Sequence, residues 1–162
     1  MPTTTVLTYL ALWSAIGCVL FSIYVVLVFK TGAVYTARKE DGTLKEKIPL
    51  SGLFNMLVLL LCIVGFLVAA NYFGLVQREI TLRFLPLLGL NYAHFAILFA
   101  FDTIAIDGLL LSVWRPAFLD LPEAMEATSM KKHILISLPV GLVAGLALSA
   151  ISTVIAYFVW FN

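Results

Sequence analysis

Hydrophobic positions along the chain gather in four long stretches, separated by shorter polar segments. A helix that crosses a bilayer needs about 20 predominantly apolar residues. Four stretches meet this length, and they cover about residues 6–29, 49–75, 84–114 and 134–160. The pattern therefore predicts an all-α fold, a bundle of four transmembrane helices that forms a single integral membrane domain over residues 1–162.

The composition agrees with a lipid environment. Of the 162 residues, 62% are hydrophobic and 12% are charged, whereas a soluble domain averages about 45–50% apolar and about 25% charged residues. The polar residues are too few to cover a soluble domain, so the lipid bilayer is the first expected partner. A formal net charge of +1 gives no basic surface, which excludes a nucleic-acid-binding protein.

Basic residues are concentrated in two connecting segments. Residues 30–48 and 115–133 hold most of them, whereas the connection between the second and third stretches holds Arg78 and Arg83. Cytoplasmic loops of membrane proteins are enriched in Lys and Arg. We therefore expect both long loops in the cytoplasm and both termini on the non-cytoplasmic side. The basic residues of the two loops are Lys30, Arg38, Lys39, Lys45, Lys47, Arg115, Lys131 and Lys132.

The first stretch is expected to be a retained helix. Residues 1–5 contain no Lys or Arg, whereas a signal peptide begins with a basic region and has a shorter apolar core. In the second long loop, Asp120 is placed to cap a short helix that begins near Pro122. We expect this helix to lie along the membrane interface.

Ionisable residues within the four stretches occur in the third one: His94, Asp102 and Asp107. Such groups are costly in a membrane, so they face protein or water and are candidates for function. Asn91, His94 and Asp102 lie on one face of an α-helix. Asp107 follows Asp102 by five residues, about 140° around an α-helix, so its side chain is expected to point elsewhere.

Two interpretations stay open for these four residues, which form the candidate intramembrane polar site. Asn91 and His94 are typical of hydrogen bonds between helices. Asp102 is either a buried carboxyl that stays protonated or bonds a neighbouring donor, or a group that carries a proton or a cation in a water-filled pocket. For Asp107 a structural tether is favoured. No catalytic residue is assigned.

Metal and cofactor chemistry have little support in the sequence. The two histidines, His94 and His133, lie too far apart along the chain's predicted helices to share one iron. His94 alone could ligate a haem or chlorin from a neighbouring chain, but a lone histidine on an apolar face is usually structural. No cofactor and no metal site are therefore expected. Cys18 and Cys62 are interpreted as small packing residues.

The fourth stretch carries a stripe of small residues, spaced four apart: Gly141, Gly145, Ser149 and Thr153. This pattern lets helix backbones approach closely. The stripe is expected to mediate helix packing, either inside the bundle or with another copy or another membrane chain. A ridge on the first helix, Ser14, Cys18 and Ser22, is a possible facing surface.

The end of the third stretch resembles a known family. Residues 101–110 (Phe-Asp-Thr-Ile-Ala-Ile-Asp-Gly-Leu-Leu) and the following Trp114-Arg115-Pro116-Ala117-Phe118 and Leu121-Pro122 are similar to a family of uncharacterised bacterial four-span membrane proteins. Its members carry an Asp-x4-Asp motif in this helix. The chain has Gly108 where the family often has Trp, and Glu123 where it has Gly. The resemblance implies the four-span fold and a bacterial inner (plasma) membrane, and it singles out Asp102 and Asp107.

Motifs for nucleophilic catalysis and phosphate binding are missing from the sequence. The function expected first is therefore a non-enzymatic subunit or scaffold that packs against other membrane chains or against itself. The alternative is a small oligomeric proton-coupled transporter or carrier with Asp102 as its titrating carboxylate. A small membrane enzyme comes third, because it would need polar groups that converge from at least two helices.

Overall fold

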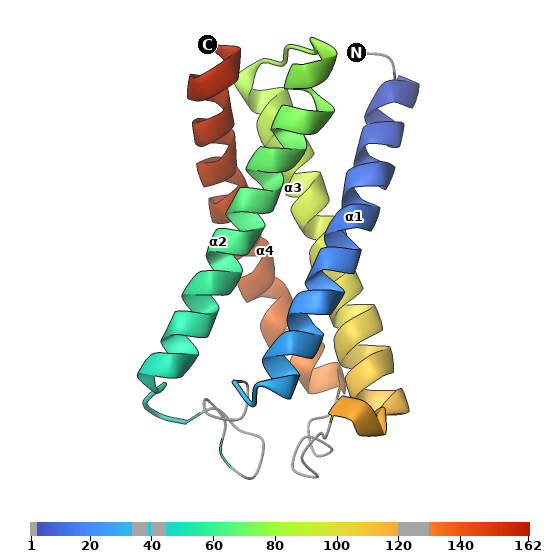
Figure 1. Cartoon of the computed structure of the whole chain (residues 1–162), viewed down its shortest axis with the longest axis vertical. Helices are drawn as coiled ribbons and strands as arrows, with labels where there is room; N and C mark the ends of the chain where they lie inside the picture. The colour runs from blue at the N-terminus through green and yellow to red at the C-terminus, as the bar shows by residue number, and fades with distance from the viewer. Residues whose placement is uncertain (1–2, 34–38, 40–44, 120–129) are drawn as a thin grey trace.

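The computed structural model shows a bundle of four long helices (Figure 1). It describes the backbone of residues 3–33, 39, 45–119 and 130–162, and the side chains of these residues except 3, 112 and 130–137. The described part contains no strand, and all four helices are long and apolar enough to cross a membrane. The prediction of an all-α four-helix fold is confirmed. The helices are α1 (Thr3–Lys30), α2 (Leu50–Gly74), α3 (Phe84–Phe101) and α4 (Met130–Ala156).

The third helix changes its winding half-way along. α3 continues without a break into η3, a π-helix over Asp102–Trp114. A π-helix is bonded between residues five apart and is commonly a single turn found at functional sites. The segment ends at Arg115, whose φ of 46° is left-handed and whose N–H donates to the carbonyl of Leu110 at 2.9 Å. The predicted interfacial helix near Pro122 lies outside the described residues.

Both ends of the helical chain lie on one side of the bundle. The start of α1, the end of α4 and the connection between α2 and α3 are at the same end in Figure 1. This connection is tight: it holds a 3-10 turn, η2 (Val76–Arg78), closed by Glu79 with a left-handed φ of 56°. α4 extends into a short π-helix, η6 (Tyr157–Phe161), at this end. A second 3-10 turn, η4 (Ala117–Leu119), follows η3 at the opposite end.

Two layers of buried apolar side chains hold the bundle together. The layer near the start of α1 joins Tyr9 to the fully buried Leu75, Leu87 and Ala156. The layer near the opposite end joins α1 to η3 and η4. Its members are Val25, Phe29, Ile106 and Leu119. Between them lies a zone of polar side chains, described below.

The small residues of α4 pack inside the bundle against α3. A Cβ atom added to Gly141 would overlap the ring of Phe99, and one added to Gly145 would overlap the ring of Phe95. Ser149 and Thr153, further along the stripe, are fully buried. Of the two uses expected for this stripe, the structure shows packing within one chain.

The proposed facing ridge on α1 does not meet that stripe. Ser14 contacts His94 of α3, and Ser22 donates to the carbonyl of Cys18 in its own helix at 2.8 Å. Within one chain, aromatic side chains of α3 rather than this ridge lie against the glycines of α4.

Candidate functional site

The centre of the bundle contains polar side chains from all four helices. Each of these side chains is at least nine-tenths buried. They lie inside a bundle of four helices that are long and apolar enough to cross a membrane. We call this set the polar core. Its members are Tyr9 and Ser14 of α1, Asn71 of α2, Asn91 and His94 of α3, and Ser149, Ser152 and Thr153 of α4.

A hydrogen bond in the polar core links α3 to α4. Asn91 donates from Nδ2 to Thr153 Oγ1 at 2.9 Å. The Thr153 hydroxyl in turn donates to the backbone carbonyl of Ser149 at 2.7 Å. The threonine hydroxyl is thus fixed by its own helix and presents its oxygen to the asparagine, as expected for a polar contact between membrane helices.

The histidine ties α1 to α3. Ser14 Oγ and His94 Nδ1 share a hydrogen bond at 3.0 Å. The ring of Tyr9 meets the imidazole edge-on, with centroids 5.0 Å apart and planes at 70°. The Tyr9 hydroxyl continues past the histidine and donates to Asn71 Oδ1 of α2 at 3.1 Å. Tyr9 therefore connects His94 to a second helix.

Four polar atoms of the polar core are buried without a hydrogen-bond partner: Asn71 Nδ2, Asn91 Oδ1, His94 Nε2 and Ser149 Oγ. The residues that carry them have no exposed surface. A buried polar atom left unpaired costs about 1–3 kcal/mol. The polar core therefore has hydrogen-bonding capacity that the protein itself does not use.

The two aspartates lie further along the same helix, at the change from α to π winding. Asp102 is the first residue of η3, and both carboxyls are half-buried within the third candidate span. They are close enough to interact electrostatically. In a π-helix, residues five apart are about one turn apart, so the separation of about 140° expected for α-helical winding does not apply to Asp102 and Asp107. The direction of the Asp107 side chain stays a prediction.

The candidate residues thus fall into two places. Asn91 and His94 belong to the polar core, whereas Asp102 follows His94 by eight residues, about 12 Å along the helix axis. Leu98 lies between His94 and Asp102 on the same face and is buried. The structure does not bring the four predicted residues into one site.

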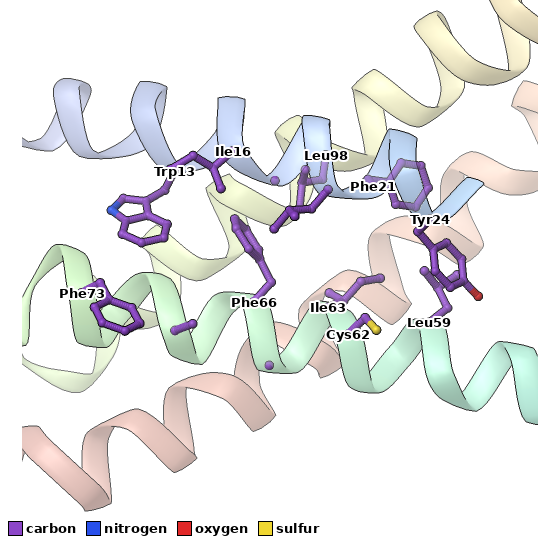
Figure 2. Close-up of a pocket in the computed structure, with 14 residues that line it drawn as sticks. Trp13, Ile16, Phe21, Tyr24, Leu59, Cys62, Ile63, Phe66, Phe73 and Leu98 are labelled. Carbon is purple, nitrogen blue, oxygen red and sulfur yellow. The ribbon is translucent and has the colours of Figure 1, made fainter. Parts of the chain in front are cut away.

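An apolar cleft of about 730 Å³ opens between α1 and α2. Figure 2 shows Phe66 of α2 projecting toward Leu98 of α3, with Trp13 and Phe73 on one side and Tyr24 on the other. Trp13 and Phe73 stack with centroids 6.4 Å apart. The lining is almost entirely apolar, so the cleft offers space for hydrocarbon rather than a set of reactive groups. Cys62 lines it as an exposed free thiol.

Metal and cofactor binding can be considered residue by residue. Among the described residues, no three side chains of His, Cys, Asp or Glu are grouped as metal ligands. His94 is fully buried behind Tyr9, so a haem or chlorin of a neighbouring chain would have to displace that ring. The side chain of His133 lies outside the described part.

Sequence reasoning did not name three members of the polar core, Tyr9, Asn71 and Ser152, and it named Ser14 only as a packing residue. The sequence gives a reason to suspect Asn71, because this polar residue interrupts an otherwise apolar stretch. It gives little reason to suspect Tyr9 and Ser14, because tyrosine and serine are common in membrane helices for unrelated reasons.

Comparisons with known proteins return no match: no family model, no curated protein and no solved structure is similar to the chain. The resemblance of residues 101–122 to a bacterial four-span family therefore stays a prediction.

Proposed function

We propose that the protein is a small proton-coupled membrane carrier that works as an oligomer, with Asp102 as its proton-binding carboxyl. The observation that carries this proposal is the pair of half-buried carboxyls, Asp102 and Asp107, within a span. Charged carboxyls are costly within a membrane, and two that interact electrostatically are more so, so such a pair favours binding a proton or a cation. The π-helix that creates the pair supports a functional role.

Two features of the bundle favour the carrier over the scaffold that the sequence analysis placed first. The small-residue stripe of α4 is one of the features that support a scaffold, together with the short loops and the missing catalytic motifs, and it packs inside the chain. Polar side chains converge from four helices rather than one. Both features favour a protein that binds a polar molecule or an ion within the membrane.

The orientation is part of the proposal. The end of α1, the start of α2 and η4 border the basic loops 30–48 and 115–133, and they lie at the end of the bundle opposite the start of α1. By the positive-inside rule this end is cytoplasmic, which puts both termini outside and the carboxyl pair in the cytoplasmic half of the membrane. The membrane is proposed to be a bacterial inner membrane.

The proposal can be tested by charge movement in proteoliposomes on a solid-supported membrane. A proton that binds to a carboxyl inside the bilayer moves charge across part of the membrane, even without a transported solute. A step in pH should therefore evoke a transient current in the wild-type protein. Asp102→Asn should abolish this current, whereas Glu46→Gln, which neutralises an exposed carboxyl outside the spans, should preserve it. Equal currents in the wild type and Asp102→Asn would contradict the proposal.

The subunit or scaffold remains a second candidate, favoured by α2. This helix is the least buried of the four candidate spans. Its first half exposes Leu50, Leu53, Leu57 and Leu61 on one face. The mass of the particle purified in mild detergent from its native membrane decides between the two. Other chains in fixed stoichiometry would make the protein a subunit, whereas a few identical copies would exclude that role.

A further inference from the structure

The four unpaired atoms of the polar core come from three helices but are connected by the contacts already described. Asn91 and His94 are three residues apart, so they share a face of α3. Asn91 is bonded to Thr153, one turn from Ser149. His94 is in ring contact with Tyr9, which bonds Asn71. The unpaired atoms therefore belong to one continuous cluster.

Their chemistry is mixed and uncharged. Asn71 Nδ2 is a donor, Asn91 Oδ1 is an acceptor, and the Ser149 hydroxyl can be either. His94 Nε2 takes either role, depending on its tautomer. No Asp, Glu, Lys or Arg is among the buried side chains of the described residues. A multivalent metal ion favours carboxylates, thiolates or several histidines, and this cluster has a single histidine, so the set suits a small neutral molecule that both donates and accepts hydrogen bonds.

The cluster is closed at both ends by apolar side chains. Leu87 precedes Asn91 by one turn of α3, and Ala156 follows Thr153 by three residues; both are fully buried. On the other side, Leu98 follows His94 by one turn and is buried. A molecule held here is enclosed by protein and out of contact with lipid.

From these observations we propose that the polar core is an occluded hydrated site, in which bound water pairs with Asn71, Asn91, His94 and Ser149. Buried water typically makes two to four hydrogen bonds to otherwise unpaired polar groups, as this set provides. When Nδ1–H donates to Ser14 Oγ, Nε2 of the neutral ring accepts a hydrogen bond from this water; in the other tautomer Nε2–H donates to it.

The groups that face His94 are neutral. They are Ser14 and Tyr9 from α1 and Asn91 from its own helix, with Asn71 of α2 reached through the Tyr9 hydroxyl. The nearest carboxyl on the same helix, Asp102, is eight residues away behind Leu98. The hydrated site therefore does not rest on the carrier proposal, and it can be tested in a protein whose Asp102 is replaced.

Water-edited solid-state NMR tests the site in lipid bilayers. The full-length protein is labelled with ¹⁵N-histidine and ¹³C-leucine, and His133→Gln leaves His94 as the sole histidine. Magnetisation that starts on water should reach His94 Nε2 several-fold faster than it reaches the side chain of Leu67, which is equally buried but apolar. Equal rates for His94 and Leu67 would overturn the proposal.

Two variants test whether the transfer from water to His94 depends on the polar core and not on Asp102. Ser149→Ala removes one of the four polar atoms with little change in volume, and it should slow the transfer from water to His94. Asp102→Asn should leave that transfer unchanged, even if it abolishes the charge movement predicted above. Loss of transfer in Asp102→Asn would show that the water at His94 depends on the carboxyl pair and would overturn the independent site.

Discussion

Asn91 and Thr153 are joined by a hydrogen bond of 2.9 Å from Nδ2 to Oγ1, and both residues have no exposed surface. This contact couples the two helices that pack most closely around the polar core. Because Asn91 Nδ2 would otherwise be unpaired in an apolar interior, the two side chains should contribute cooperatively to the stability of the bundle.

A double-mutant cycle with Asn91→Leu and Thr153→Val measures that coupling. Hydrogen bonds between membrane helices average about 0.6 kcal/mol in such cycles and reach about 1.7 kcal/mol. We expect a coupling free energy in this range from reversible unfolding in SDS–detergent mixtures. Strict additivity of the two substitutions would show that the hydrogen bond contributes nothing to stability.

Gly145 of α4 should be far less tolerant of substitution than Gly65 of α2. Gly145→Ala places a methyl group into the Phe95 ring, and overpacking of this kind typically costs about 1–3 kcal/mol. Gly65→Ala is the matched control, since no atom lies within 4 Å of its new methyl group. Thermal unfolding in detergent should show a lower midpoint for Gly145→Ala and an equal or higher one for Gly65→Ala. The reverse order would mean that α4 does not pack against Phe95.

The sequence predicts the helices well because a span is defined locally, by the length of an apolar run. It also places Asn91 and His94 on one face, since α3 keeps α-helical winding up to Phe101. The partners of these residues depend on which helices are neighbours, and a single sequence does not specify that order. Tyr9 and Asn71 were missed for this reason.

The position of Asp107 shows a second limit of prediction from the sequence, which concerns the winding of the helix. A rotation of 100° per residue assumes an α-helix, and nothing in the local composition of residues 102–114 signals a π-helix. The carboxyl pair therefore becomes visible only once the backbone winding is known.

Cysteine labelling tests the proposed orientation. In a background with Cys18 and Cys62 replaced by Ala, single cysteines are introduced at Gln77, in the short turn, and at Lys45, in the first basic loop. Both positions are exposed. A membrane-impermeant maleimide should modify position 77 in intact cells and position 45 only after the membrane is opened. The opposite pattern would place the basic loops outside and reverse the topology.

The central claim is that the carboxyls of Asp102 and Asp107 form a proton-binding pair inside the membrane. Infrared difference spectroscopy of the protein in lipid bilayers, recorded between two pH values, measures this directly through the C=O stretch of a protonated carboxyl. The account predicts a carboxyl band that changes with pH, disappears in Asp102→Asn, and shifts in Asp107→Asn because the two groups interact. A spectrum without such a band, or one that is the same in Asp102→Asn as in the wild type, would contradict it.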